Sequence, residues 1–304
     1  MNRKIILITG ATAGIGRITA LHLARAGHHV IASGRAQSAL DELRAEAAQE
    51  SLRLDVVQLD VTRADSIASC ATAVAQLTDG AGPDVVVNNA GYGTAAPVSE
   101  MSDADVRAQY ETNVFGLLSV IRAFLPAMQA RRSGRIINIS SIGGKVTLPF
   151  FGPYNSTKYA VESLSDAMRV ELKPFGIQVV LVEPGAIRTN FSSRSLKEAE
   201  AYHVESSPYA PALAAFRKML DQVDRTSPGP LVVARAIQRA VEARRPRARY
   251  VAPFVGRLML LTAAILPTWL IDWMFSRVMG LTQKKLGKPT STETVRAERT
   301  ESAA

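Results

Sequence analysis

The sequence predicts one α/β domain with a doubly wound parallel sheet, followed by a helical extension at the C-terminus. Short runs rich in Val and Ile alternate with amphipathic segments long enough for crossover helices. A glycine-rich turn joins the first apolar run to the first of these segments. The length of 304 residues, with 47% hydrophobic and 21% charged residues, suits one large domain. Strands joined by helices form parallel sheets that are covered on both faces.

The predicted elements follow one another in that alternating order. Strands are expected over Lys4–Thr9, His29–Ser33, Arg53–Leu59, Asp84–Asn88, Arg135–Ile139 and Gln178–Val182. Helices are expected over Gly14–Ala26, Ser38–Gln49, Ala64–Leu77, Asp103–Arg131, Tyr154–Lys173 and Pro230–Ala243. Broken helical stretches over 190–228, interrupted by Ser-Ser-Pro and Ser-Pro-Gly, indicate a mobile cover over a site. We expect a main domain over 1–250, an apolar helical extension over 251–283 and a polar, disordered tail over 284–304.

Charge and cysteine content limit the compartment and the partners. The net charge of +9 is concentrated from Arg244 onward, where there are eleven Lys/Arg and four Asp/Glu. Anionic lipid or nucleic acid could bind such a segment, and a solvated tail is the simpler alternative. Because only this tail points to nucleic acid, we expect no nucleic-acid partner. The single cysteine, Cys70, and an N-terminal apolar run too short for a signal peptide predict a cytoplasmic location.

The turn after the first strand predicts a dinucleotide site. It reads Gly10-Ala11-Thr12-Ala13-Gly14-Ile15-Gly16. Glycines allow the backbone to approach a pyrophosphate, and the helix N-terminus adds N–H donors and a positive dipole. We therefore expect cofactor contacts from Gly10, Thr12, Gly14, Ile15 and Gly16. A plain strand–helix turn is the alternative.

Two residues that follow the second and third strands bear on which dinucleotide binds. NAD sites usually carry an acidic side chain after the second strand, whereas this sequence has Gly34 and Arg35. A guanidinium matches the oxygens of a 2′-phosphate, so Arg35 favours NADP(H) over NAD(H). A solvent-facing loop arginine is the alternative. Asp60 could accept a hydrogen bond from adenine or belong to the cap of the next helix.

Tyr154 and Lys158 lie one helical turn apart, on the same face of a predicted helix. Free tyrosine has a pKa of about 10, and lowering it by ~2–3 units takes ~3–4 kcal/mol. An ammonium about 4 Å away supplies that much at an effective dielectric constant of ~20. Such a tyrosine can exchange a proton with a substrate. Ser141 could hold the substrate oxygen, and Ser140 is the alternative by position alone.

Together these motifs make the sequence resemble the short-chain dehydrogenase/reductase family, of the ordinary Tyr-x-x-x-Lys type. The resemblance covers about residues 4–190. It is carried by Thr9–Gly16, Asn88-Asn89-Ala90-Gly91, Asn113, Ser141, Tyr154, Lys158 and Pro184-Gly185. It implies a Rossmann-type, seven-stranded parallel sheet, no metal at the catalytic centre, and a homo-oligomer, either dimer or tetramer.

The resemblance also implies individual roles. Asn113 would hold a water in a proton relay to Lys158, which would itself bond the nicotinamide ribose. Asp60 would contact adenine. The catalytic residues would be Asn113, Ser141, Tyr154 and Lys158. The cofactor site would further include Asn89, Ala90, Gly91, Pro184, Gly185 and Thr189.

The C-terminal third predicts an apolar substrate. The cover over 190–228 carries Phe191, Tyr202, Tyr209, Pro211, Leu213 and Phe216. Arg249-Tyr250, followed by an apolar stretch with Leu266-Pro267, resembles relatives that act on retinoids, steroids or other lipids. Leu258–Ile271 is uncharged but shorter than the ~20 residues that a spanning helix needs. The stretch is a lid helix or a subunit contact in one interpretation, and in the other an interfacial helix pair at the inner face of a membrane.

The combined prediction is an NADP(H)-dependent oxidoreductase. It moves a hydride between nicotinamide and a carbonyl or alcohol carbon of an apolar substrate, with Tyr154 as the general acid/base. An NADP-binding regulatory or scaffold protein of the same fold, and a 3-oxoacyl-type reductase, are the alternatives.

Overall fold

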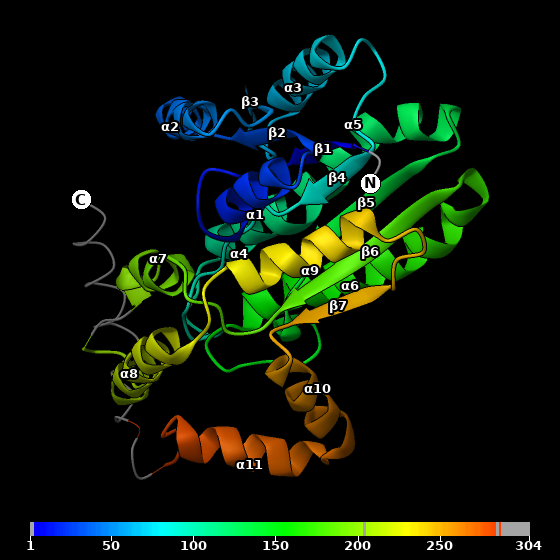
Figure 1. Cartoon of the computed structure of the whole chain (residues 1–304). Coiled ribbons are helices and arrows are strands. Elements are labelled where there is room, and N and C mark those ends of the chain that lie inside the picture. The colour runs from blue at the N-terminus through cyan, green and yellow to red at the C-terminus, as the bar shows by residue number, and fades with distance from the viewer. Residues whose placement is uncertain (1–2, 203–204, 284–285, 287–304) are drawn as a thin grey trace.

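Seven parallel strands form the centre of the molecule, in the order β3-β2-β1-β4-β5-β6-β7 (Figure 1). They are β1 (Ile5–Ile8), β2 (His29–Gly34), β3 (Leu54–Gln58), β4 (Val85–Asn88), β5 (Gly134–Ile139), β6 (Ile177–Pro184) and β7 (Arg249–Ala252). The computed structural model describes residues 3–202, 205–283 and 286. The predicted fold class is confirmed, including the seventh strand that the family resemblance implied.

Helices cover both faces of this sheet. One face packs against α1 (Gly14–Arg25), α2 (Gln37–Gln49) and α9 (Leu231–Glu242). The other face packs against α3 (Ala64–Leu77), α5 (Leu117–Ala130) and α6 (Gly152–Glu171). Buried Val, Ile and Leu side chains of the strands fill the space between the layers, as expected when a parallel sheet is enclosed on both sides. Burial raises the pKa of the Cys70 thiol in α3 to about 12, so this thiol is neutral.

The long helix predicted over Asp103–Arg131 is continuous but not uniform. It consists of α4 (Asp103–Tyr110), one π-helical turn η1 (Glu111–Gly116) and α5. By length and composition, this stretch is the one helix among the described residues that could cross a membrane. It nevertheless packs Val120, Ile121 and Phe124 against the sheet, so its apolar character is that of a core helix.

The sheet order reverses between β1 and β4, and the ends of both strands face the same edge. In open α/β sheets, ligands bind at the carboxyl ends of the strands at such a switch point. The glycine turn follows β1, Asn89 follows β4, Ser141 follows β5 and Gly185 follows β6. The topology therefore gathers the predicted motifs at one edge.

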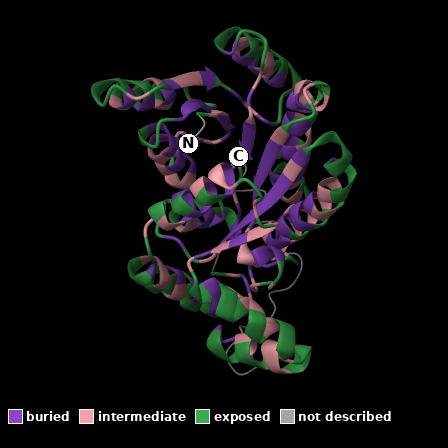
Figure 2. Cartoon of the chain, turned by 45° about the vertical axis from the view of Figure 1, so that its right-hand side comes forward, coloured by how far each residue is buried: buried purple, intermediate pink, exposed green. Residues whose placement is uncertain are grey.

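Two segments extend beyond this sandwich. The lid, residues 190–228, contains α7 (Phe191–Lys197), η4 (Glu200–Tyr202) and α8 (Ala210–Thr226). After β7, α10 (Val255–Ile265) and α11 (Thr268–Val278) form a hairpin that projects from the body (Figure 1) and is mostly exposed (Figure 2). Apart from residue 286, the predicted tail over 284–304 lies outside the described residues. The division into domain, extension and tail remains a prediction.

Candidate active site

The glycine turn is locked against the segment that follows β4. Gly10 has a φ of +63°, and a Cβ there would lie 2.9 Å from the Cα of Ala90. A Cβ on Gly16 would lie 2.5 Å from Asn89 Nδ2 and would overlap the carbonyl oxygen of Gly10. The Asn89 amide donates to the carbonyls of Thr9 and Gly10, both at 3.0 Å. Only glycine fits these two positions: at Gly10 both the left-handed conformation and the lack of space exclude a side chain, and at Gly16 the lack of space does.

The N-terminus of α1 is open to an anion. No side chain caps the helix at Ala13, and its first turn contains no acidic residue. The free N–H groups and the helix dipole therefore face the glycine turn. Thr189, which follows β6, lies across that turn, with its Cβ 3.7 Å from the position of a Cβ on Gly14. This arrangement fits the pyrophosphate of a dinucleotide.

Thr12 and Ile15 support the turn rather than project from it. A Cβ on Gly34 would meet Thr12 Cγ2 at 2.6 Å, so the glycine at the end of β2 makes room for the threonine. Ile15 is partly buried and packs against the core beneath α1. Both predicted residues therefore lie at the glycine turn, and Ile15 faces the hydrophobic core.

A cleft of about 560 Å³ lies beside the carboxyl ends of β2 and β4. Its charged lining residues are Arg35, Arg194, Asp105, Glu111 and Glu198. The Arg35 side chain is exposed, and its guanidinium forms no hydrogen bond or ion pair with any residue that the structure describes. The position and the free guanidinium are compatible with a phosphate on the adenosine ribose.

The Asp60 side chain forms hydrogen bonds within the turn that follows β3. Its Oδ1 accepts hydrogen bonds from the Thr62 amide at 3.0 Å and the Thr62 hydroxyl at 2.7 Å. Burial raises the pKa of Asp60, but the bonds from Thr62 and the nearby Arg35 and Arg63 outweigh burial and hold it below its usual value. These bonds close a turn ahead of α3, whose N-cap residue Arg63 has no side-chain cap bond, and an adenine contact of Asp60 remains a prediction.

The four predicted catalytic residues come together between α6, η1 and the end of β5. Lys158 Nζ lies 5.7 Å from the centroid of the Tyr154 ring and donates to the carbonyl of Ile139 at 2.9 Å. The Ser141 hydroxyl hydrogen-bonds to the Tyr154 phenol and accepts a bond from the Gly143 amide at 3.0 Å. Ser140, the alternative, has a buried hydroxyl with no hydrogen-bond partner in the described part of the chain.

Asn113 owes its inward orientation to the π-helical turn η1. Its amide donates to the Tyr92 carbonyl at 2.8 Å and to Thr157 Oγ1 at 3.0 Å, and its Oδ1 accepts from the Tyr92 amide. A Cβ on Gly91 would lie 3.0 Å from Asn113 Oδ1 and 3.5 Å from Lys158 Nζ. Gly91 therefore keeps the space between these two side chains open. π-turns of this kind are frequent at functional sites.

The protein by itself keeps the tyrosine protonated. Burial raises the pKa of Tyr154 to about 12, against a smaller lowering by its bond to Ser141. Burial also lowers the pKa of Lys158 to about 8, with Glu162 opposing the change. This differs from the lowered tyrosine pKa expected from the sequence. Burial, rather than the lysine one turn away, therefore sets the protonation of the phenol.

An apolar wall surrounds the phenol. The rings of Phe151 and Phe191 lie 5.8 and 5.3 Å from the ring of Tyr154. Phe150, in a left-handed conformation with φ of +68°, packs against Phe216 at 5.2 Å. The same apolar cluster includes Tyr209, Leu213, Leu220, Phe275 and Met279. Phe150 and Phe151 are not among the residues predicted for the site, although an aromatic pair just before the catalytic helix is a signal that the sequence does offer.

Two residues expected in this wall lie elsewhere. The Tyr202 hydroxyl bonds to Asp105 and accepts from the Ser102 amide at 2.8 Å. Tyr202 therefore fastens the lid to α4, within a separate cluster around Met101. Pro211 is exposed on α8.

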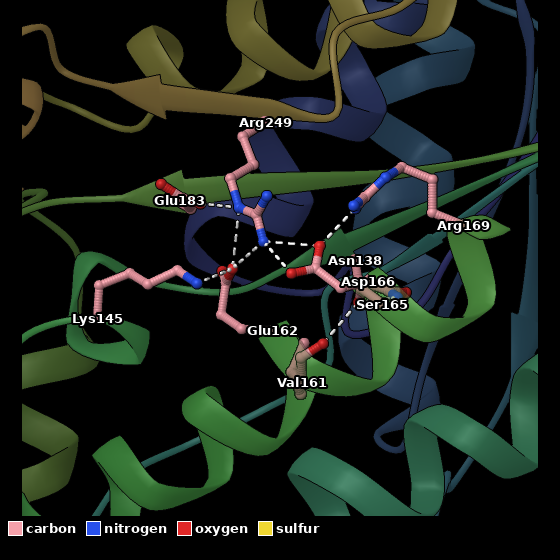
Figure 3. Close-up of polar contacts among 9 residues, drawn as sticks. All are labelled: Asn138, Lys145, Val161, Glu162, Ser165, Asp166, Arg169, Glu183 and Arg249. Carbon is pink, nitrogen blue, oxygen red and sulfur yellow. Dashed lines mark hydrogen bonds and ion pairs between the residues drawn. The ribbon is translucent and has the colours of Figure 1, made fainter.

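A charge network around the buried carboxylates of Glu162 and Glu183 joins α6 to β6 and β7 (Figure 3). The Arg249 side chain, from β7, lies 3.2 Å from Glu162 Oε2, 2.6 Å from Asp166 Oδ2 and 3.1 Å from Glu183 Oε1. Lys145 adds a contact of 3.2 Å to Glu162. Burial and the carboxylate of Glu162 raise the pKa of Glu183 to about 7, with Arg249 opposing. The network joins α6, β6 and β7 behind the catalytic residues.

Comparison with known proteins decides the family. Residues 4–200, more than half of the chain, match the family described as short chain dehydrogenase. The chain is a short-chain dehydrogenase/reductase. It is 34% identical over 286 residues to the 3-ketodihydrosphingosine reductase of Bacteroides thetaiotaomicron, covering 92% of this chain and 98% of that protein. It is 33% identical over 279 residues to retinol dehydrogenase 16 of Homo sapiens, covering 88% and 86%.

A solved structure agrees with this assignment. A short-chain dehydrogenase/reductase from Burkholderia phymatum, crystallised in complex with NAD, superposes with a TM-score of 0.75 at 25% identity. The alignment covers 90% of this chain and 95% of that one. As a short-chain dehydrogenase/reductase, the protein is an oxidoreductase whose fold binds nicotinamide dinucleotides, as predicted.

Proposed function

We propose that this enzyme uses NADP(H) to reduce the carbonyl, or oxidise the alcohol, of an apolar lipid-like substrate. The observation that carries the proposal is the Tyr154 phenol, bonded to Ser141, next to Lys158 and walled by Phe151 and Phe191. The arrangement offers a proton donor, a cation and an apolar surface at one point. These are the groups that a carbonyl reduction requires from the protein.

In the proposed reaction, the bound nicotinamide supplies the hydride to the carbonyl carbon, or accepts it in the reverse direction. The hydroxyls of Ser141 and Tyr154 hold the substrate oxygen, and Tyr154 donates its proton as charge develops there. The Lys158 ammonium stabilises the resulting phenolate. Asn113 holds a water that returns a proton through Lys158. The aromatic wall excludes bulk water from this exchange.

The cofactor preference rests on Arg35. Its free guanidinium lines the cleft beside β2, where a 2′-phosphate would form paired hydrogen bonds. Arg35→Asp should weaken the binding of NADPH more than the binding of NADH, since the new carboxylate would repel the 2′-phosphate. Steady-state kinetics with both cofactors would measure this shift. An unchanged ratio of kcat/KM between the two would remove Arg35 from the site.

The substrate class rests on the apolar wall and on the named relatives. One relative is named for a ketosphingolipid base and the other for a retinol, both long-chain lipids with one reacting oxygen. A screen of long-chain 3-keto lipids, retinal, steroids and 3-oxoacyl thioesters for NADPH consumption would separate a lipid reductase from the 3-oxoacyl alternative.

Tyr154→Phe tests whether the protein is a catalyst or a regulatory NADP-binding protein. Loss of the hydroxyl should lower kcat by about 10²–10⁴-fold, because the proton donor is gone while the ring remains. NADPH binding, followed by fluorescence, should be retained. Equal turnover by the variant would overturn the mechanism.

We further propose a homo-oligomer and a cytoplasmic location at the inner face of a membrane. A shallow cleft of about 370 Å³ on α4 and η1, lined by Val106, Tyr110 and the exposed Phe115, supports a subunit contact on the long helix. Sedimentation of the wild type and of Phe115→Arg would test it, with dissociation expected for the variant.

A further inference from the structure

The hairpin carries most of the exposed apolar surface of the described chain. Of the seventeen large hydrophobic residues exposed among the described residues, ten lie within it and at its start. They are Phe254, Val255, Leu258, Met259, Leu261, Ile265, Trp269, Trp273, Met274 and Val278. Ile265 is 80% exposed and Trp269 is 69% exposed. Contiguous apolar patches on a folded surface mark interaction sites.

The dimensions of the hairpin favour a position along a membrane surface over a span. Each helix has eleven residues, or about 16 Å at ~1.5 Å per residue, roughly half of a ~30 Å hydrocarbon core. Pro267 separates the helices, so they cannot form one longer helix. Both helices present apolar side chains outward. Such a pair of helices can insert its apolar outer side into the membrane interface, while the loop between the helices stays out of the hydrocarbon core.

The few charged groups of the hairpin suit a lipid headgroup layer. Between residues 253 and 283 the charged residues are Arg257, Asp272 and Arg277. Trp269, Trp273 and Arg277 follow one another at intervals of one turn along α11, and the Arg277 guanidinium lies 5.6 Å from the Trp273 ring. Arg257 lies 5.7 Å from the Phe254 ring. Tryptophan with neighbouring arginine is the composition found at membrane–water interfaces.

The apolar surface continues from the hairpin to the catalytic tyrosine. Phe275 and Met279, at the end of α11, pack in the same cluster as Phe216 of α8 and Tyr154 of α6. The side of α11 that faces the protein therefore belongs to the same apolar cluster as the aromatic residues around Tyr154. A route from the hairpin to the phenol would meet apolar side chains along its length.

We propose that α10 and α11 dock the enzyme on an anionic bilayer, and that its lipid substrate reaches Tyr154 from that bilayer along the Phe275–Met279 side. The docking stands on the exposed surface, while the substrate route rests on the proposed function. The occupant of the patch is thus the membrane interface, rather than a second copy of the chain.

The chain contains its own probe for docking. Its two tryptophans are Trp269 and Trp273, both on α11, so tryptophan fluorescence reports on the hairpin alone. Vesicles of phosphatidylcholine and phosphatidylglycerol should shift the emission of the full chain to the blue, and brominated lipids should quench it. The protein should also float with these vesicles in a density gradient.

Charge placed on the hairpin should abolish docking. Leu258→Glu with Ile265→Glu should lower the partition coefficient about a hundredfold or more, since two apolar side chains are lost from the interface. Val170→Glu, on a 69% exposed valine of α6, is the matched control and should bind like the wild type. Arg257→Gln with Arg277→Gln should remove about fivefold per arginine on anionic vesicles, and little on neutral ones.

The substrate route has a separate readout. The Leu258/Ile265 variant should lose activity on a keto lipid held in vesicles and keep activity on a short, water-soluble ketone. Unchanged emission and no flotation of the wild type would overturn the docking. If that variant instead dissociates an oligomer in sedimentation, and the wild type ignores vesicles, a second copy covers the patch and the proposal fails. Docking without turnover of any carbonyl would count against the proposed function, not against the docking.

Discussion

The catalytic helix α6 and the hairpin of α10 and α11 place charged and apolar groups in opposite environments. In α6, Lys158 and Glu162 are buried, and each finds partners within the protein. In the hairpin, tryptophans and aliphatic side chains lie exposed, and the arginines stack on neighbouring rings. Contacts within the protein therefore stabilise α6. The outer side of the hairpin, in contrast, can be covered only by a partner from outside the chain.

The largest expected effect comes from breaking the network behind α6. Arg249→Leu should lower the free energy of unfolding by about 3 kcal/mol, because the buried Glu183 would lose its contact with a cation and Glu162 would keep only Lys145. The loss should be larger at alkaline than at acidic pH, since protonation relieves the unpaired carboxylates. Chemical denaturation at several pH values would measure it.

Arg257→Leu is the matched control for this prediction. Its guanidinium lies over Phe254 on the exposed hairpin, so the change should alter stability in solution by less than about 0.5 kcal/mol. Similar losses for the two variants would contradict the distinction between the regions.

A smaller difference should separate two valines. Val161 is fully buried on α6, and Val161→Ala should cost about 2 kcal/mol through lost burial and the resulting cavity. Val278 is 67% exposed on α11, and Val278→Ala should be nearly neutral. Denaturation of both variants would decide this. A cost for Val278→Ala comparable to that for Val161→Ala would mean that the hairpin is covered in solution.

The pH profile of turnover tests the electrostatics of α6. Because the pKa of Lys158 is lowered to about 8 and that of Tyr154 is raised to about 12, both groups are protonated below pH 8. The rate of carbonyl reduction should be flat below that pH. Above pH 8, the rate should fall about tenfold per pH unit as the ammonium loses its proton, which corresponds to about 1.4 kcal/mol in activation free energy. Alcohol oxidation should rise with pH up to about 8 and then level.

Glu162 provides the internal comparison for this profile. Its carboxylate raises the pKa of Lys158, so Glu162→Gln should move the break in the reduction profile to lower pH. Gln in place of Glu keeps the shape, so a changed break with retained NADPH binding identifies an electrostatic role. A break at the same pH in both proteins would mean that the group titrating in the profile is not Lys158.

The sequence alone predicted most of the sheet and the catalytic constellation, because both depend on local patterns. Six strands and the helices between them were visible as alternating apolar runs, and the glycine turn was set by the steric demands at Gly10 and Gly16. Tyr154 and Lys158 were recognisable because one helical turn separates them. Strand β7, only four residues long, was expected through the family resemblance rather than from its own pattern.

Features that depend on distant contacts were not predicted. Arg249 meets carboxylates from α6 and β6, and nothing in the neighbouring sequence signals that meeting. The raised pKa of Tyr154 reflects burial by Phe151 and the lid, which outweighs the lysine identified from spacing. Tyr202 was predicted to line the substrate pocket because it is aromatic, but its hydroxyl hydrogen-bonds to Asp105 on α4.

The hydrogen bonds from Asn89 to the carbonyls of Thr9 and Gly10 have a thermodynamic consequence. The turn is held in its bent form by the protein itself, so little backbone freedom remains to be lost when a dinucleotide arrives. Asn89→Ala would return that freedom to the loop, and the cofactor would then have to order it. The resulting loss of affinity would arise although the removed side chain bonds only to the turn.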